Sequence, residues 1–293
     1  MYSLHKIPVG VYEKAFPTEY SLEQILISAK QSGYDFVELA IDESPDRLER
    51  LNWSSSERAA VRQAIFNTGM PIFGMGVSAH RKYPLGSVSS DVRKRGLDIL
   101  YQSIELAFDL GARVIQIMGY DAFYEPSNED TQANFLEGLR IGVDWASAAG
   151  VMLAIENVDH ELVDSVEKAM RFVKTLNSPW FKVYPDIGNM TAAGYNPLEQ
   201  LPLAEGYLVG VHVKDTRLGE VRGIPLEQGI VPFRDTLRLL SRMGFSGPLV
   251  MEMWAHLDQT GDPVGSATQA CAKLSQWITE AWENTPVNHK EDK

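Results

Sequence analysis

Four polar residues stand at the ends of four apolar segments in the second half of the chain. They are Glu156, Asp186, His212 and Glu252, at the ends of the runs 151–155, 181–184, 207–213 and 248–252. Three carboxylates and an imidazole are oxygen and nitrogen donors that suit Mn²⁺, Zn²⁺, Co²⁺ or Mg²⁺, and intrinsic affinity favours Zn²⁺ over Mn²⁺. If the four segments are neighbouring strands of a barrel, these residues predict one divalent metal site at its mouth. Ion-paired rim acids and a core histidine are the alternative interpretation.

A second group of residues could bind an anion. His80, Arg81 and Lys82 follow the apolar run 72–77, and Lys214 and Arg217 follow the third residue of the metal set. Basic residues in a row are usually solvated surface, so spacing alone leaves both interpretations open. Separately, Glu38 lies near the end of the run 36–40. It is a candidate anchor for a substrate hydroxyl or for a neighbouring arginine.

Eight short runs of aliphatic and β-branched residues are expected to be the strands that position these side chains. They cover 7–11, 36–40, 72–77, 113–118, 151–155, 181–184, 207–213 and 248–252. Continuous apolar runs are typical of parallel strands covered on both faces. A residue that readily adopts a left-handed conformation precedes seven of them and can end a helix there. These residues are Gly33, Gly69, Gly111, Gly150, Asn177, Gly206 and Gly244.

Amphipathic stretches between the runs predict the helices. Ser21 to Gln24 reads as a capping box that opens the first one. Apolar residues at helical spacing are expected to face the core. They are Leu22, Ile25, Leu26 and Ala29, then Val92, Leu100, Ile104, Ala107 and Phe108, then Phe135, Leu139, Val143 and Ala146, then Phe233, Leu237 and Leu240, and in a last helix over 263–284 Leu274, Trp277, Ile278 and Ala281.

This alternation predicts an α/β fold, a single (β/α)8 TIM barrel, with an open doubly wound sheet as the second choice. At 293 residues one domain over 1–293 is the simplest expectation, with a polar tail from about residue 286.

Composition excludes several classes of protein. Twenty-seven Lys and Arg against 39 Asp and Glu give a net charge of −12, which disfavours nucleic acid as a partner. No run approaches the roughly 18 apolar residues of a membrane span. The one cysteine, Cys271, cannot form an internal disulfide, and no signal peptide is evident, so we expect a cytoplasmic location. No phosphate loop, GxSxG or CxxC motif appears.

Several segments resemble one family along the chain from about residue 7 to the last helix. They include 8–15 (PVGVYEKA), 36–44 (FVELAIDES), 78–87 (SAHRKYPLGS), 115–121 (IQIMGYD), 184–189 (YPDIGN), 211–216 (VHVKDT) and 251–254 (MEMW). The family is the L-ribulose-5-phosphate 3-epimerases, also called L-xylulose-5-phosphate 3-epimerases and formerly labelled hexulose-6-phosphate isomerases. They are xylose-isomerase-like barrels that act in L-ascorbate and related pentose catabolism.

The resemblance implies a metal-dependent 3-epimerase whose ligands are the four residues above. Zinc is the expected ion, with manganese or cobalt as alternatives. Epimerases of unphosphorylated ketoses carry His three residues after the metal Asp and Arg six after the metal His. Here those positions are Asn189 and Leu218, which favours a phosphorylated ketopentose. His80, Arg81, Lys214 and Arg217 are then the candidate phosphate contacts.

Epimerisation at C3 needs a base on each face of an enediolate, and Glu156 and Glu252 are the candidates. The expected partner is a small-molecule sugar phosphate, without nucleic acid or membrane, and a homodimer is compatible. The leading alternative is an aldose–ketose isomerase on the same barrel. An abasic-site endonuclease would need more histidines and a basic face, and a sugar-binding barrel would not need paired glutamates.

Overall fold

The expected barrel is present in the computed structural model, which describes residues 7–283. Within that range the strands are β1 (Val9–Tyr12), β2 (Phe36–Ile41), β3 (Ile72–Val77), β4 (Val114–Met118), β5 (Met152–Glu156), β6 (Phe181–Val183), β7 (Val211–Val213) and β10 (Leu249–Met251). They pair in parallel in the order β6-β5-β4-β3-β2-β1-β10-β7. Parallel bridges Val183↔Leu208 and Asp186↔His212 join the two ends. The sheet therefore closes, which excludes the open doubly wound alternative.

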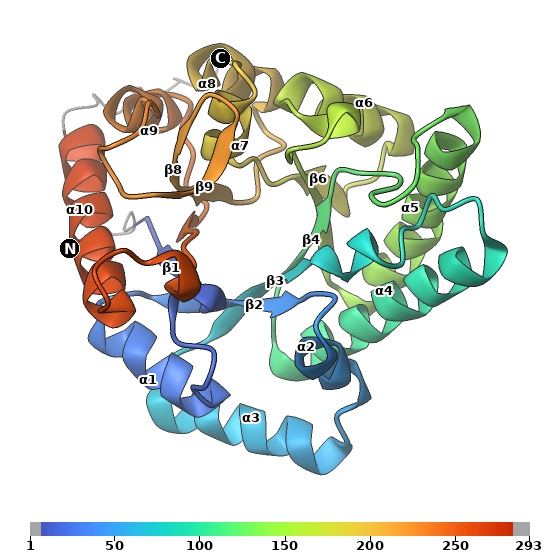
Figure 1. The fold of residues 1–293 in the computed structure, drawn as a ribbon, viewed down its shortest axis with the longest axis horizontal. Coiled ribbons are helices and arrows are strands. Elements are labelled where there is room, and N and C mark those ends of the chain that lie inside the picture. Colours follow the sequence, from blue (N-terminus) through green and yellow to red (C-terminus); the bar gives the residue numbers. More distant parts are fainter. Residues whose placement is uncertain (1–6, 284–293) are drawn as a thin grey trace, which may run out of the picture.

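Helices surround the ring of strands (Figure 1). They are α1 (Leu22–Gln31), α2 (Pro45–Glu49), α3 (Ser55–Thr68), α4 (Ser90–Leu110), α5 (Glu129–Ala149), α6 (Val166–Leu176), α7 (Ile187–Ala192), α8 (Pro197–Gln200), α9 (Phe233–Arg242) and α10 (Pro263–Glu283). The last helix matches its expected range as far as the structure is described. The single domain stays a prediction, and the polar tail lies outside the described residues.

Local signals at the helix ends are confirmed. The seven Gly and Asn residues expected to be left-handed all have positive φ, from 46° at Asn177 to 92° at Gly33. At the start of α1, Ser21 Oγ accepts a hydrogen bond from the Gln24 amide, and the Gln24 side chain accepts one from the Ser21 amide. These caps depend on neighbouring residues alone, which is why sequence predicts them.

The expected core stripes are largely confirmed, with two departures in α4. Leu100, Ile104 and Ala107 are buried, but Phe108 is 66% exposed and Val92 is only partly buried. The buried stripe of this helix continues through Leu110, so Phe108, one 100° step beyond Ala107, points outward.

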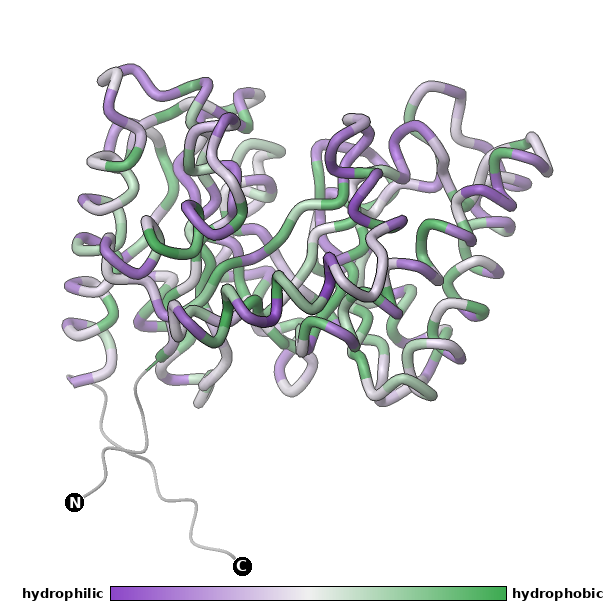
Figure 2. The backbone as a smooth tube through the Cα atoms, turned by 90° about the horizontal axis from the view of Figure 1, so that it is seen from below, coloured by the Kyte–Doolittle hydropathy of each residue, from purple (hydrophilic) through white to green (hydrophobic). Residues whose placement is uncertain are grey.

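Hydrophobic stretches concentrate toward the middle of the molecule, and hydrophilic ones on loops and outer turns (Figure 2). Among the described helices, none is both long enough and apolar enough to cross a lipid bilayer.

One element was not expected. An antiparallel hairpin, β8 (Asp215–Arg217) and β9 (Glu220–Ile224), follows β7, with Gly219 at φ 74° in its turn. It extends the loop between β7 and α9 and forms part of the wall beside the barrel mouth, where Arg222 lines a cavity.

Candidate metal centre and active site

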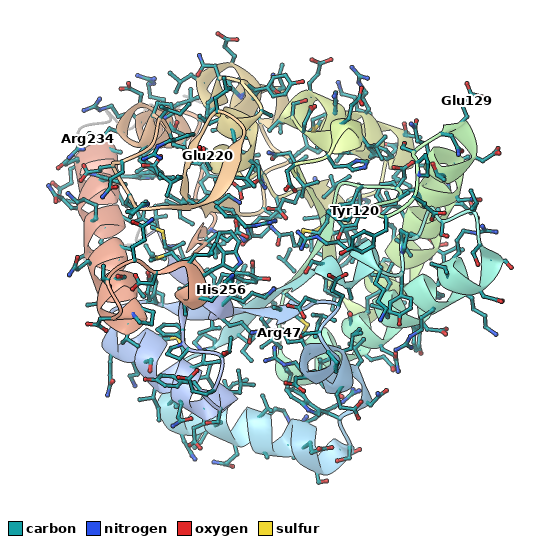
Figure 3. All side chains as sticks on the ribbon, in the orientation of Figure 1. Arg47, Tyr120, Glu129, Glu220, Arg234 and His256 are labelled. Carbon is teal, nitrogen blue, oxygen red and sulfur yellow. The ribbon has the colours of Figure 1, made fainter. Side chains whose placement is uncertain are left out.

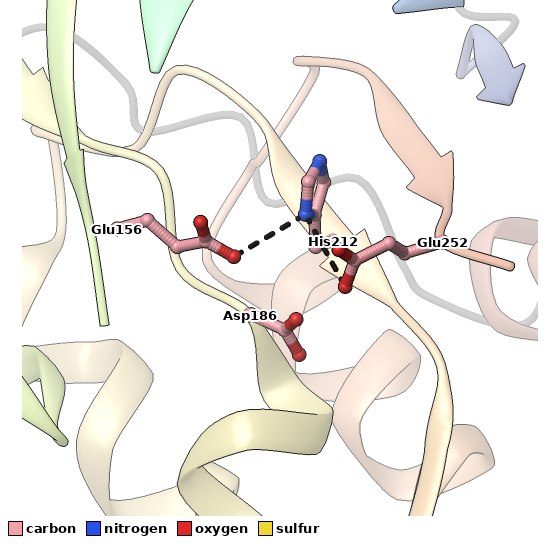
Figure 4. A group of neighbouring side chains, drawn as sticks. All are labelled: Glu156, Asp186, His212 and Glu252. Atoms are coloured by element: carbon pink, nitrogen blue, oxygen red, sulfur yellow. Dashed lines mark ion pairs between the residues drawn. The ribbon is translucent and has the colours of Figure 1, made fainter. Parts of the chain in front are cut away.

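The four residues expected to bind a metal converge at one end of the barrel. Glu156 is the last residue of β5, His212 lies in β7, and Glu252 follows β10. Asp186 precedes α7, where its Oδ1 accepts hydrogen bonds from the Gly188 and Asn189 amides at 2.7 and 2.9 Å. One potential ligand atom from each residue lies within 4.8 Å of the others. Figure 4 shows Glu156 and Glu252 reaching the cluster from opposite sides, with His212 between them.

The cluster is buried, so its charges depend on one another. Glu156, Asp186 and His212 are almost inaccessible to solvent, and Glu252 is partly buried. The Nδ1 atom of His212 lies 3.4 Å from Glu156 Oε1 and 3.8 Å from Glu252 Oε2. Buried carboxylates are stable only beside positive charge, so this arrangement favours a bound cation.

Lys214 supplies positive charge to the cluster. Its ammonium lies 2.6 Å from Asp186 Oδ2 and 2.6 Å from Glu252 Oε2. Burial disfavours the charged amine, yet the neighbouring carboxylates raise the pKa of Lys214. The sequence placed this lysine among the phosphate contacts. In the structure it pairs with two members of the proposed metal set, and its role as a phosphate contact stays a prediction.

The acids of the cluster titrate differently because their surroundings differ. Burial raises the pKa of Glu156 and raises that of Asp186 to about 7. Burial also acts on Glu252, but the Lys214 and His212 cations outweigh it and lower its pKa to about 2. The pKa values of the two candidate catalytic carboxyls are therefore shifted in opposite directions, which is a common property of acid–base pairs.

A cavity of about 340 Å³ opens directly onto this cluster. It is lined by Glu156, Glu252, Lys214 and Trp254, by His256, which also follows β10, and by residues that follow other strands, such as Arg47 of α2. Figure 3 shows Arg47 and His256 near the centre of the view, whereas Glu129 and Arg234 lie at its edge. The position agrees with the rule that barrel sites form at the carboxyl ends of strands.

Of the candidate phosphate contacts, Arg81 reaches this cavity in a state suited to binding an anion. Its guanidinium lies over the Phe123 ring at 5.1 Å, and its buried Nε has no hydrogen-bond partner among the described residues. Burial opposes its charge, but Tyr120 and Asp159 nearby raise the pKa of Arg81. The residue therefore stays cationic with a donor unused.

His80 and Arg217 do not line the cavity. His80 is buried, with Nε2 3.1 Å from the carbonyl oxygen of Gly96, and burial lowers its pKa to about 4. It is therefore neutral at pH 7. Arg217 is exposed on the hairpin, where it lies 3.6 Å from Glu220.

Sequence reasoning missed three basic residues of the cavity, Lys14, Arg47 and Arg222. Lys14 is the second residue after β1, so the rule that barrel sites form at strand ends could have found it. Each has an acidic neighbour: Lys14 lies 2.5 Å from Asp42, Arg47 2.8 Å from Glu13, and Arg222 4.0 Å from Asp159.

Glu38 has different partners from those expected. Among the described residues, Glu38 pairs with no arginine, and it does not line the cavity. Its carboxylate lies beside His212 inside the barrel, at 2.7 Å.

The chain is similar to known proteins over most of its length. A family model described as xylose isomerase-like TIM barrel matches residues 26–280. L-ribulose-5-phosphate 3-epimerase UlaE of Escherichia coli K12 is 42% identical over 274 residues, covering 93% of this chain and 94% of the relative. The protein of the same name from Salmonella heidelberg is 43% identical over 273 residues. The match covers 93% of this chain and 94% of the relative.

Solved structures show the same fold at low identity. An L-ribulose 3-epimerase superposes with a TM-score of 0.81 at 18% identity, covering 98% of this chain and all of its own. A D-psicose 3-epimerase superposes with a TM-score of 0.79 at 17% sequence identity. The match covers 93% of this chain and 99% of the D-psicose 3-epimerase chain.

Proposed function

The chain belongs to the xylose isomerase-like TIM barrel family, and from that premise we propose that it interconverts L-ribulose 5-phosphate and L-xylulose 5-phosphate as a metal-dependent 3-epimerase. Its relatives are named as epimerases, so the chain is an enzyme of the isomerase class. The observation that carries the proposal is the pair Glu156 and Glu252, which face one buried cluster from opposite sides.

The residues present fit a divalent ion. The donor set is oxygen and nitrogen, it is buried, and the four atoms are close enough to share one ion. Asp186 Oδ2 has Lys214 as an ion-pair neighbour, but no aligned hydrogen-bond donor among the described residues reaches it. We propose zinc, with manganese and cobalt as the alternatives that this donor set also accepts.

The reaction requires proton transfer on both faces of C3. When bound, a divalent cation would acidify the C3 proton of a chelated ketose and neutralise charge on its oxygens. One glutamate takes the proton from C3, and the other, protonated, returns one to the opposite face. Lys214 orients Glu252 through a 2.6 Å hydrogen bond. The roles of the two glutamates exchange in the reverse direction.

We propose that Arg81 holds the phosphate, because it lines the cavity with an unused donor. A guanidinium binds phosphate through charge-assisted hydrogen bonds. Lys14, Arg47 and Arg222 add positive charge to the same cavity, although each is partly offset by its acidic neighbour. We further propose a cytoplasmic role in pentose phosphate metabolism, since a charged sugar phosphate crosses membranes poorly.

Proton NMR in D₂O tests the reaction. The protein loaded with Zn²⁺, Mn²⁺ or Co²⁺ is incubated with L-xylulose 5-phosphate. We expect exchange of H3 with solvent and the appearance of L-ribulose 5-phosphate. Exchange at C1 with formation of an aldose would identify an aldose–ketose isomerase instead.

A further inference from the structure

Glu38 and His212 form a short buried contact that the proposed chemistry does not yet use. Glu38 lies in β2 and is 1% exposed. Its Oε1 is 2.7 Å from His212 Nε2, across 174 residues of sequence. The other ring nitrogen, Nδ1, is the one that faces Glu156 and Glu252. The imidazole therefore bridges Glu38 and the metal cluster.

This geometry selects one form of the histidine. An ionised carboxylate can only accept a hydrogen bond, so the ring hydrogen lies on Nε2. A histidine that binds a metal is neutral and carries one N–H, so with that hydrogen on Nε2 the lone pair of Nδ1 is directed at the cluster. We propose that Glu38 is a positioning residue that fixes the tautomer and orientation in which His212 binds the metal. The inference rests on the metal site of the proposed function.

The surroundings of Glu38 support a fixed orientation. Its second oxygen, Oε2, accepts a hydrogen bond of 3.1 Å from the hydroxyl of Tyr184, which is itself buried. The Tyr184 ring stands edge-on to the His212 ring, with centroids 5.2 Å apart. A Cβ at Gly210 would lie 2.5 Å from the Tyr184 ring, so only glycine there leaves room for it.

A competing partner for the ring is less well placed. The side-chain nitrogen of Gln116 lies 3.4 Å from both ring nitrogens of His212. Those distances are long for hydrogen bonds, whereas the Glu38 contact is short. Glu38 is therefore the partner that sets the ring.

Cobalt binding tests the inference without relying on activity. Purified protein, freed of metal, is titrated with Co²⁺ against a competing chelator, and the visible absorption of bound Co²⁺ reports affinity and coordination. Glu38→Gln keeps the size of the side chain and removes its charge. Loss of a carboxylate behind a metal-binding histidine typically weakens metal affinity about 10–100-fold, and we expect a loss in that range.

Two further variants separate positioning from general stability. Tyr184→Phe removes only the hydroxyl that holds Glu38, and we expect a smaller loss of Co²⁺ affinity in the same direction. Asp121→Asn alters another buried carboxylate, which accepts hydrogen bonds from Ser127 and Thr131. It should keep the parental affinity for Co²⁺.

Parental affinity in folded Glu38→Gln would overturn the inference. If that variant does not fold, parental affinity in Tyr184→Phe would overturn it. An equal loss in Asp121→Asn would show general disruption and would also overturn it. A parent protein that binds no Co²⁺ would remove the metal centre itself, which is the distinct failure of the proposed function.

Discussion

The two glutamates of the site reach it from β5 and β10, which are not neighbours in the barrel. Strands β6 and β7 lie between them and contribute Asp186 and His212. The two carboxyl groups therefore approach the cluster from opposite sides (Figure 4). A single base would instead require the intermediate to turn over within the cavity.

We predict that Glu156→Gln and Glu252→Gln each abolish epimerisation but keep half of the exchange reaction. Glutamine has a similar size, but it cannot carry a proton between carbon and solvent. The remaining glutamate can still remove H3 from the epimer that faces it and return deuterium to the same face. Proton NMR in D₂O should show exchange without inversion, for one epimer in each variant.

The control for these variants is Glu137→Gln, an exposed residue of α5 outside the cavity, which should behave as the parent. Exchange of both epimers in one glutamine variant would contradict the two-base assignment. So would inversion at near the parental rate.

We predict that Arg81→Ala raises KM for the phosphorylated ketose by roughly 10-fold or more, because a hydrogen bond to a charged group contributes about 1.5–3 kcal/mol. The unphosphorylated ketose should show little change. Arg140→Ala, on the exposed face of α5, is the matched control. Steady-state kinetics with both sugars measures the difference, and equal losses on both would refute a phosphate contact.

At the scale of elements, the hairpin β8–β9 depends on Asp215. This buried carboxylate accepts hydrogen bonds from the amides of Thr216, Gly229 and Val231. It thereby ties the start of the hairpin to the chain that returns from it toward α9. A Cβ at Gly229 would lie 2.1 Å from Asp215 Oδ1, so glycine is needed for this close approach.

We expect Asp215→Ala to lower the free energy of unfolding by about 1–3 kcal/mol, because buried amides lose their acceptor. Cleavage within 218–231 by a protease should also become faster. Denaturant unfolding and limited proteolysis measure the two effects. The exposed Asp235→Ala of α9 is the control, since its 3.0 Å pair with Arg238 lies at the surface. If the Asp215 and Asp235 variants behaved alike, the hairpin would not depend on this carboxylate.

At the scale of the whole molecule, we expect metal binding and folding to be linked. The four proposed ligands come from distant parts of the chain, so the candidate site forms only in the folded protein. A ligand present at 100 times its Kd stabilises the folded state by about 2.7 kcal/mol. For a chain of this size the melting temperature should rise by roughly 5 °C.

Calorimetry with and without Zn²⁺, after removal of metal, checks this expectation. Asp186→Ala and His212→Ala should lose most of the shift, because each removes one of the four ligands. For each variant, the melting temperature with Zn²⁺ is compared with that of the same variant without Zn²⁺. This is necessary because Asp186 also caps the start of α7, so its loss can lower stability without any metal. A parental shift that persists in both variants would place the ion elsewhere.

The sequence by itself determined the eight strands of the barrel, most of the surrounding helices and the four residues that meet in the candidate metal site. Helix caps such as Gly150 act through neighbouring residues, and apolar runs mark strands because burial on both faces needs them. Glu156 and Glu252 could be assigned to one end of the barrel because parallel strands all end on the same side. The position of each residue at the end of its strand was enough for this assignment, and no contact between residues had to be known.

Only the tertiary structure decided where the remaining polar side chains point. Lys214 pairs with Asp186, and His80 turns inward to Gly96 rather than toward the cavity. Glu38 meets His212 across 174 residues of sequence. These outcomes depend on which distant segment packs beside each side chain, and burial allows a charge or an imidazole only where such a partner exists. No local pattern in the sequence carries that information.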